Sequence, residues 1–362
     1  MAGLSKIPSA GFQDNVKFRN IIINGDMSIA QRRTLWEDFG NNDSGYVTVD
    51  RWKFVEAGTP TFECDISQST TVPTGQGFTK STKIDVTIAD TSLASDDLML
   101  VRQSFEGQNL QYLKYGTSNA QQLTCSFWVR SNKTGTYICN LEDSDNTKDV
   151  SQSYTINSAD TWEKKTVTFP ANTSDSFDND NARSLDLVFF LTAGSNYTSG
   201  TLNTTWNTTV SANRAVGQVN LFDSTSNEWY ITGVQLEAGT TASDFEFLPH
   251  DVNLQKCQRY YQQHGNASYA GITTSYQLSS TVSAGGFIYP VTMRATPSVG
   301  SSNLIVTNRV SYDVDCSPSG PVASPSSIYL RVTHSTAGAA DRGNLIAVKH
   351  LTTGFLKLTA EL

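Results

Sequence analysis

The stretch that decides the fold is residues 219–248, VNLFDSTSNEWYITGVQLEAGTTASDFEFL. Between Trp229 and Leu236 large apolar side chains occupy both odd and even positions, so a strand of period two would carry apolar bulk on both faces. A strand that is buried on both faces belongs in the middle of a sandwich. We therefore expect this segment to be the inner strand of the largest domain, with the rest of the chain supplying its partners.

Length and composition narrow the possible classes. A chain of 362 residues favours two domains, and only 17% of its residues are charged while 38% are hydrophobic. This composition favours β-strands joined by uncharged polar loops over a helical enzyme. The net charge of -8, without a basic face in the sequence, argues against a nucleic-acid partner.

Targeting signals are not apparent in the sequence. No apolar run approaches the roughly 20 residues of a membrane helix, so no membrane insertion is expected. The N-terminal residues lack the apolar core of a signal peptide, so we expect folding in the cytosol of the producing cell. The five cysteines form no CxxC pair, which favours buried free thiols over disulfides.

Alternation and β-branched content predict a series of strands before Pro249. The expected strands are 21–26, 46–54, 62–66, 81–88, 98–105, 122–130, 136–141, 162–169, 184–192 and 229–236. Residues 98–105 also fit a helical period, but their short length and the following Gly107 favour a strand. Residues 36–45 are expected to be a loop. Many short strands without a helix of ordinary length indicate a two-sheet β-sandwich.

The pattern changes after Pro249. Residues 251–263 contain no Gly or Pro and begin with Asp251, which predicts a short helix between domains. A smaller β region follows, in which Pro290 should mark an edge or a bulge. Its expected strands are 287–293, 304–306, 328–333, 345–348 and 355–358.

Residues with catalytic or metal-binding chemistry form no recognisable pattern. The histidines show no metal-ligand spacing, and there is no GxSxG or phosphate-loop motif. Glu228, Glu237, Asp244 and Glu246 cluster in the sequence, but a pair of glycosidase carboxylates is the less favoured interpretation. The acidic loops 143–146 and 178–181 could hold Ca²⁺, but solvated loops are favoured. We therefore expect no catalytic residue, no metal and no cofactor.

Two aromatic residues are candidates for ligand binding. Tyr197 and Trp206 lie in the long polar segment 194–215, where no apolar pattern surrounds them. A rigid ring in a loop rich in Ser, Thr and Asn can pack on the face of a sugar. In the alternative interpretation the loop folds back, and both rings close one end of the sandwich.

Several motifs together carry a resemblance to a known family. The segments IIINGDM with QRR and DRW, then ITGVQLEAG with DFE, then CQRYY, and finally FIYPVTMRATPSV occur in this order. They resemble segments of bacteriophage and prophage tail fibre or virion structural proteins. The middle of the chain resembles a carbohydrate-binding jelly roll of the galactose-binding-like kind, which has no catalytic residue to transfer.

The resemblance implies an all-β organisation. We expect an N-terminal virion-anchoring arm at 1–19 and a jelly-roll β-sandwich at 20–249. A linker helix at 250–264 and a C-terminal β-sandwich tip at 265–362 should follow. From residues alone the arm could equally be a disordered tail.

The resemblance also implies a function in the virion. We expect a non-catalytic appendage, similar to a short tail fibre, that binds host-surface polysaccharide. Other virion proteins would hold its arm, and the chain would associate as a homotrimer. The alternative is a head fibre or a capsid or tail decoration protein that binds only virion proteins. A third interpretation, an enzyme that degrades polysaccharide, is disfavoured because the chain lacks the pattern of a tail-spike β-helix.

Overall fold

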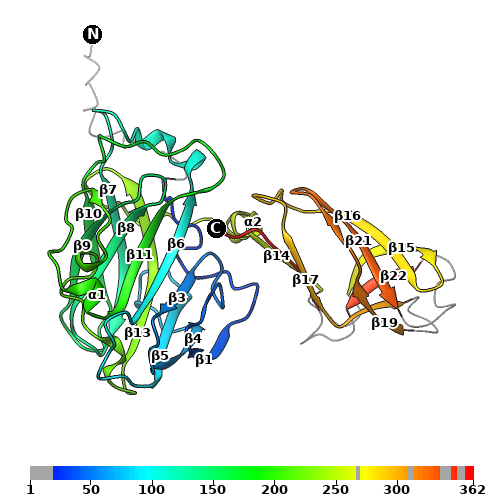
Figure 1. The fold of residues 1–362 in the computed structure, drawn as a ribbon, viewed down its shortest axis with the longest axis horizontal. Coiled ribbons are helices and arrows are strands. Elements are labelled where there is room, and N and C mark those ends of the chain that lie inside the picture. Colours follow the sequence, from blue (N-terminus) through cyan, green and yellow to red (C-terminus); the bar gives the residue numbers. More distant parts are fainter. Residues whose placement is uncertain (1–18, 266–269, 308–312, 335–343, 349–354) are drawn as a thin grey trace, which may run out of the picture.

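The computed structural model describes residues 19–265, 270–307, 313–334, 344–348 and 355–362. Its strands form two β regions along the longest axis of the molecule, with the helix α2 (His250–Gln258) between them (Figure 1). The first region is a sandwich, and we call the second the C-terminal β region. Apart from Arg19, the predicted arm lies outside the described residues, so its anchoring role stays a prediction.

The sandwich consists of two antiparallel sheets. Sheet A has the order β1-β4-β5-β13-β7-β10, and sheet B has the order β12-β9-β8-β11-β6-β3-β2. The strands of sheet A are β1 (Leu35–Gly40), β4 (Glu63–Ser69), β5 (Ser81–Ile88), β7 (Leu123–Ser131), β10 (Glu163–Phe169) and β13 (Glu228–Ala238). The strands of sheet B are β2 (Ser44–Gly45), β3 (Lys53–Ala57), β6 (Leu98–Glu106), β8 (Gly135–Asp143), β9 (Lys148–Ile156), β11 (Arg183–Ala193) and β12 (Asn207–Thr208). Because the chain crosses repeatedly between the sheets, the arrangement is a jelly roll, and the predicted fold class is confirmed.

Strand β13 is an inner strand of sheet A, as predicted. It pairs with β5 on one side and β7 on the other. A bulge between Thr232 and Gln235 shifts its register, so Trp229 and Ile231 before the bulge and Val234 after it all enter the same core. The bulge therefore explains why apolar residues occupy both odd and even positions. Both faces are nevertheless covered, because the residues from 229 to 237 are buried.

Residues 21–26 do not form the predicted strand. They run beside β13, where the Ile21 amide donates to the Leu236 carbonyl (2.8 Å) and the Val234 amide donates to the Gly25 carbonyl (2.9 Å). The side chain of the buried Gln103 bonds both the amide and the carbonyl of Ile23. A side-chain amide thus replaces the neighbouring strand that a regular ladder would need.

The predicted strand 46–54 is also wrong in its first half. Arg51 has φ of 74°, a left-handed conformation that ends any regular strand. Only the segment from Lys53 onward is extended, as β3. Strand β1 overlaps the predicted loop 36–45, and its sequence LWEDFG does not alternate clearly. Strand β9 was not predicted, although Val150, Tyr154 and Ile156 alternate there with polar residues.

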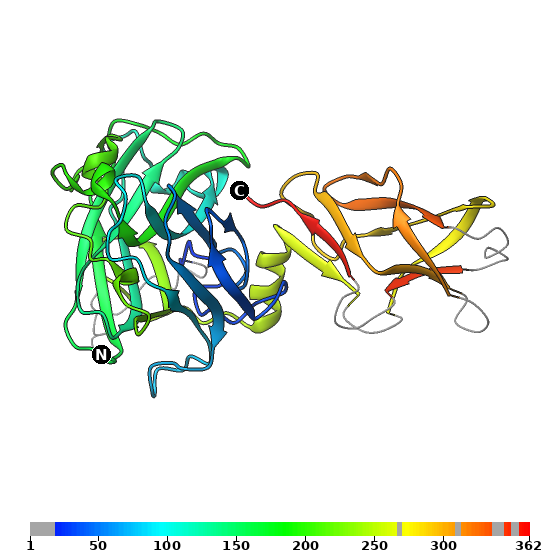
Figure 2. The same ribbon diagram turned by 60° about the horizontal axis from the view of Figure 1, so that its bottom comes forward.

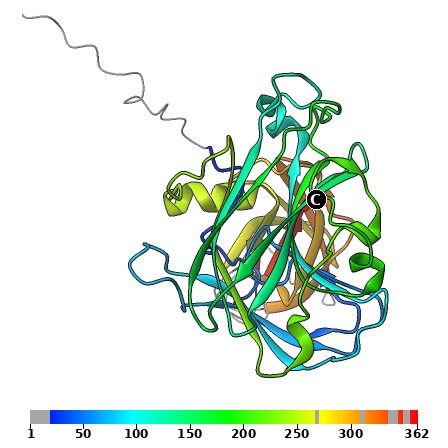
Figure 3. The same cartoon turned by 90° about the vertical axis from the view of Figure 1, so that its left-hand side faces the viewer.

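The predicted helix 251–263 is shorter than expected. Helix α2 ends at Gln258, and residues 261–264 form strand β14 (Tyr261–His264), which pairs with β23 (Phe355–Thr359). Figure 2 shows α2 beside these two strands at the junction of the two β regions. The view in Figure 3 looks along the long axis, with the sandwich in front of the C-terminal β region.

The C-terminal β region contains a small sheet and a closed one. Sheet C has the order β14-β23-β17, with β17 at Ser298–Ser302. Sheet D has the order β16-β15-β22-β18-β19-β21-β20, and β16 also pairs with β21. Its strands are β15 (Gly271–Ser279), β16 (Val282–Ile288), β18 (Leu304–Thr307), β19 (Asp313–Pro318), β20 (Val322–Ala323), β21 (Ser327–His334) and β22 (Asn344–Val348). The extra pairing closes six strands into a ring, which removes most of the open edges that a second sandwich would expose. Strand β16 ends two residues before Pro290, as the missing amide of proline requires.

Candidate functional site

The two aromatic residues proposed from the sequence lie in different places. Tyr197 belongs to the short helix α1 (Ser195–Thr198) and packs against an apolar cluster on the outer face of sheet B. Trp206 packs edge-on against Tyr115 and donates from Nε1 to the carbonyl of Pro170 (2.7 Å). Both rings are half-buried, and their role in ligand binding stays a prediction.

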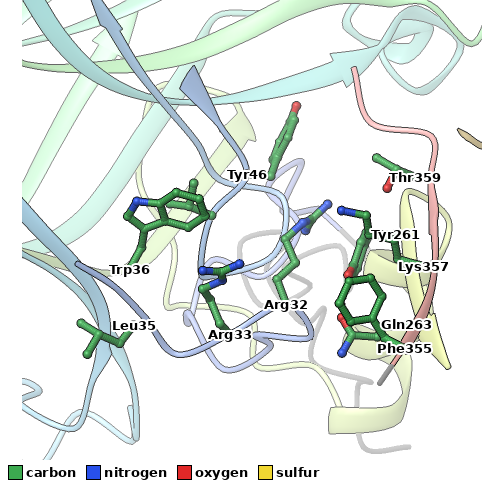
Figure 4. A pocket seen from close by; sticks show the side chains of 11 residues that line it. Arg32, Arg33, Leu35, Trp36, Tyr46, Tyr261, Gln263, Phe355, Lys357 and Thr359 are labelled. Atoms are coloured by element: carbon green, nitrogen blue, oxygen red, sulfur yellow. The ribbon is translucent and has the colours of Figure 1, made fainter. Parts of the chain in front are cut away.

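A cleft of about 640 Å³ lies between the sandwich and the C-terminal β region (Figure 4). The sandwich contributes the segment leading into β1 and the residues that follow β2, while β14 and β23 form the other wall. The lining residues are Arg32, Arg33, Leu35, Trp36, Tyr46, Val47, Tyr261, Gln263, Phe355, Lys357 and Thr359. Among the described residues, those that line the cleft include three cations and no carboxylate.

Each cation of the cleft lies near an aromatic ring. The guanidinium carbon of Arg32 is 3.7 Å from the centroid of Tyr261, and that of Arg33 is 4.3 Å from the centroid of Trp36. The Nζ atom of Lys357 is 5.6 Å from the ring of Phe355. Such pairs hold the charged groups in place, and at the exposed Arg33 and Lys357 the outer N–H groups stay accessible to a ligand.

Arg32 is the anchored member of this set. It forms ion pairs with Glu361 (2.9 Å) and with the buried Asp50 (3.5 Å). Arg33 and Lys357, in contrast, are exposed. The cleft therefore combines one fixed cation with two that a ligand can reach.

Burial raises the pKa of three ionisable side chains around Arg32. Desolvation raises the pKa of Asp50 to about 6, although Arg32 and Gln31 lower it. Burial, and then the charge of Glu361, raises the pKa of Tyr46. Burial also raises the pKa of Tyr261 to about 12. At neutral pH both phenols are protonated, so they can donate as well as accept hydrogen bonds.

Buried ion pairs hold the two walls of the cleft together. Arg51, fully buried, pairs with Glu361 and donates to the Ser104 carbonyl (2.7 Å). The Tyr46 hydroxyl donates to the Leu362 carbonyl (2.8 Å). On the other side of the junction Arg259 pairs with Glu106 (2.7 Å), which is itself buried. The cleft therefore has a fixed shape, because both of its walls are tied by charge-assisted bonds.

The clustered carboxylates have local structural roles. Glu228 lies 3.0 Å from both Lys83 and Arg130. Glu237 accepts from the Ser243 amide (2.8 Å), and Glu246 accepts from the Asn20 amide (3.0 Å). Asp244 contributes its main-chain carbonyl, which accepts from Arg19 (3.3 Å). These bonds organise the ends of β13 and the segment that follows it.

Histidines and acidic loops are likewise used in packing. His334 shares a hydrogen bond with Ser283 (3.2 Å), and His264 packs edge-on against Phe287. In the loop after β8, Asp143 accepts from the amide of Asn146 (3.0 Å). In the part of the chain that the structure describes, no group of three or more His, Cys, Asp or Glu residues is placed to hold a metal ion. All five cysteines are free, as predicted.

Within the described ranges, no helix has both the length and the apolar content needed to span a bilayer.

No residue of the cleft was proposed as a site from the sequence, although part of the cleft carries a signal there. Arg32, Arg33 and Trp36 lie within one short segment, and aromatic residues beside arginines are a recognisable sign of a binding loop. The other wall could not be found in this way, because Tyr261 and Phe355 come from segments far along the chain. Only the fold brings them opposite Arg32.

Comparison with known proteins gives likenesses in structure alone. No family model matches the chain, and neither does any curated protein sequence. One similar structure is the enzymatically active domain of bacteriophage CBA120 tailspike protein 4, at 13% identity and a TM-score of 0.30. The likeness covers 61% of this chain but only 21% of that one.

Two further similar structures are named for sugar binding. A putative sugar binding protein from Bacteroides thetaiotaomicron has 12% identity and a TM-score of 0.31, over 60% of this chain and 99% of that one. A family 11 carbohydrate-binding module from Clostridium thermocellum has 10% identity and a TM-score of 0.28, over 58% and 97%. Likenesses at these values do not decide the function. The resemblance to phage proteins has no support from sequence families and stays a prediction.

Proposed function

We propose that this protein is a virion appendage that binds a glycan of the host surface through the cleft and catalyses no reaction. The observation that carries the glycan part is the set of three cation–aromatic pairs around the cleft. Aromatic rings pack against the apolar faces of sugars, and the neighbouring N–H groups can donate to sugar hydroxyls. The virion part rests on the sequence resemblance.

A glycan array probed with the purified protein tests the binding. We expect selective binding that falls at least tenfold in Trp36→Ala, because the half-buried ring supplies contact area in the cleft. Tyr112→Ala, which removes an exposed ring outside the cleft, is the control and should bind as the unmodified protein does. Equal binding by Trp36→Ala and Tyr112→Ala would show that the glycan does not bind in the cleft.

The arm at 1–19 and the homotrimer belong to the same proposal. Attachment by the arm to other virion proteins would tether the chain to the particle. Three clefts on one trimer would raise avidity for a repetitive polysaccharide. Sedimentation of the purified protein tests the trimer, and deletion of residues 1–19 should abolish incorporation into particles. A monomer in solution would contradict the trimer.

A second function, decoration of the virion through protein contacts alone, is favoured by an apolar hollow on the C-terminal β region. The hollow has a volume of about 420 Å³ and includes Phe287, Ile328 and Tyr329. Ile288, which is 81% exposed, and Val322, which is 66% exposed, also line the hollow. Exposed aliphatic side chains in one place are typical of protein interfaces.

One substitution separates the two functions. Ile288→Asp should abolish incorporation into particles if the hollow binds a virion protein, while glycan binding by the purified chain stays unchanged. If the array shows no glycan binding and Ile288→Asp abolishes incorporation, decoration of the virion through protein contacts is the favoured function. Release of reducing ends from host polysaccharide would instead show an enzyme.

A further inference from the structure

The outer face of sheet B is divided into an apolar part and a charged part. Cross-strand partners in a sheet share a face, so the register defines rows of side chains across it. One row contains Val55, Leu100 and Phe190, and the segment with α1 packs on it through Tyr197 and Leu202. This apolar part is therefore covered by the chain itself.

The next rows of the same face carry charged side chains. Lys53 on β3 is the partner of Arg102 on β6, and Asp186 on β11 is the partner of Glu142 on β8. Figure 1 shows these four strands side by side. Arg183, at the start of β11, pairs with Asp186 and with Glu142 (3.5 Å for the latter). Arg214, from the covering segment, pairs with Glu142 as well.

Cations outnumber the carboxylates that face them. Among the described residues of this face, the four cations Lys53, Arg102, Arg183 and Arg214 stand against two carboxylates, Asp186 and Glu142, and Glu361 from the junction also acts on Lys53. A third carboxylate farther along the sheet, Asp149, accepts hydrogen bonds from two asparagine side chains instead. The four cations are half-buried, with exposed side-chain fractions of 18% for Arg102 and 32% for Arg183. They are therefore partly desolvated and still within reach of a ligand.

The cations of this face also repel one another, which lowers the pKa of two of them. Burial lowers the pKa of Lys53, and the charges of Arg102 and Arg183 lower it further. Burial and then the charge of Arg102 lower the pKa of Arg214 to about 10. An anion placed among these groups would relieve that repulsion.

The charged part of this face is continuous with the cleft. Tyr46 lines the cleft, and the Nζ atom of Lys53 is 6.0 Å from its ring centroid. Arg102 also acts electrostatically on the Tyr46 hydroxyl. The guanidinium carbon of Arg32 is 5.5 Å from the centroid of the same Tyr46 ring, and Lys53 is the partner of Arg102, so cations lead from Arg32 in the cleft to Arg102 on the sheet. In a chain of net charge -8, such a concentration of positive charge points to a specific ligand.

We propose that Lys53, Arg102, Arg183 and Arg214 extend the cleft into a second subsite for an acidic polysaccharide, one that bears anionic groups along its length. This proposal rests on the proposed function, since it names the chemistry of the glycan. The interspersed carboxylates Asp186 and Glu142 favour a sugar over a nucleic acid. Glu142, with a side chain that is 19% exposed, can accept hydrogen bonds from hydroxyl groups, whereas both charges would repel a continuous phosphate backbone.

An array of bacterial surface polysaccharides tests the proposal. It should carry carboxylated polymers, each beside its carboxyl-reduced form, as well as phosphodiester-linked and neutral polymers. We expect binding to an anionic class, loss of binding after carboxyl reduction if that class is the carboxylated one, and a fall of at least tenfold between 50 and 500 mM salt. The class that binds identifies the source of the anionic group.

Matched variants locate the subsite. Lys53→Gln and Arg102→Gln should each weaken binding about fivefold to tenfold, because each removes a charge-assisted hydrogen bond. Lys164→Gln, on an exposed position of β10 in sheet A, makes the same change of charge and should have no effect. If Arg102→Gln fails to fold, Lys53→Gln carries the test, since the contact found for its side chain is with the Tyr46 ring.

Several outcomes would overturn the proposal. Binding to neutral polymers, or binding that survives carboxyl reduction and high salt, would leave the glycan function standing and remove the acidic ligand. Unchanged affinity in Lys53→Gln and in Arg102→Gln would show that these side chains form no subsite. Equal affinity for a double-stranded DNA fragment at the same salt would replace the glycan with a nucleic acid. A blank array would contradict the proposed function and this inference together.

Discussion

At the scale of single residues, the junction depends on charges that are removed from water. Arg51 is fully buried in a left-handed conformation, with its guanidinium carbon 3.5 Å from the ring centroid of Tyr260. Asp50, the preceding residue, is 1% exposed. The sequence around Asp50 and Arg51 alternates like a strand, and nothing in it signals a buried guanidinium. The partner that makes the conformation favourable, Glu361, lies too far along the chain to be inferred.

The raised pKa of Asp50 predicts a dependence of stability on pH. The folded protein holds this proton up to about pH 6, whereas an unfolded chain releases it near 3.8. The folded state therefore binds more protons in this window, and the free energy of unfolding should fall as the pH rises through it, by up to about 3 kcal/mol. Asp50→Asn should show a shallower fall in urea denaturation between pH 4 and 7. Identical curves for the two proteins would contradict the assignment.

Trp206 provides a second prediction at this scale. Because its ring packs on Tyr115 and its Nε1 atom is bonded to Pro170, Trp206→Ala should lower the free energy of unfolding by about 2 kcal/mol. Tyr276→Ala, which removes a ring that is 55% exposed, is the control and should change stability little. Weakened glycan binding without a loss of stability would instead assign the Trp206 ring to a binding site.

At the scale of elements, most strands of the sandwich could be predicted because alternation and β-branched content reflect burial directly. Strand β5 has the predicted limits, and β6 is a strand despite its helical spacing, since both of its faces are covered. The wrong predictions share a cause. At 21–26 a side chain replaces the neighbouring strand, and at residues 261–264 pairing with β23 outweighs helical propensity. In both segments the backbone conformation depends on residues far away in the chain, which the local sequence does not reveal.

The bulge in β13 predicts a position that requires glycine. Gly233 has φ of 62°, and an added Cβ would lie 2.5 Å from Cζ of Phe78. Gly233→Ala should therefore cost about 2–4 kcal/mol, because it adds a clash in the core to the strain of the backbone. Gly75→Ala is the matched control, with φ of 76° and no atom within 4 Å of the added Cβ, and should cost about 1 kcal/mol. Equal losses in thermal unfolding would mean that Phe78 moves aside.

At the scale of the whole molecule, the candidate site is a property of the junction. One wall of the cleft comes from residues 32–47 of the sandwich. The other wall, from β14 and β23, depends on how the C-terminal β region docks. Composition could indicate the class of fold, but it could not indicate that β14 and β23 would face Arg32 and Trp36. The surplus of cations on sheet B was equally hidden, because Lys53, Arg102 and Arg183 come from three separate strands.

The ion pairs of Glu361 predict that the junction contributes to global stability. Glu361→Gln leaves the buried Arg51 without a carboxylate, and we expect a loss of about 3 kcal/mol in the free energy of unfolding. Lys133→Gln, which breaks the half-exposed pair with Asp223, should cost less than about 1 kcal/mol. Small-angle X-ray scattering should also show a wider distribution of shapes for Glu361→Gln. An unchanged scattering curve and stability would mean that other contacts suffice to hold the junction.

The distance along the chain between Arg51 and its partner has a consequence for biosynthesis. The two residues are separated by 310 positions, so a ribosome adds 310 residues after Arg51 before the guanidinium can meet its carboxylate. A nascent sandwich would have to wait with that cation still hydrated, and its interior could close only late. Closure of the junction should therefore follow synthesis of residue 361, with docking of the C-terminal β region as the last step between these two β regions.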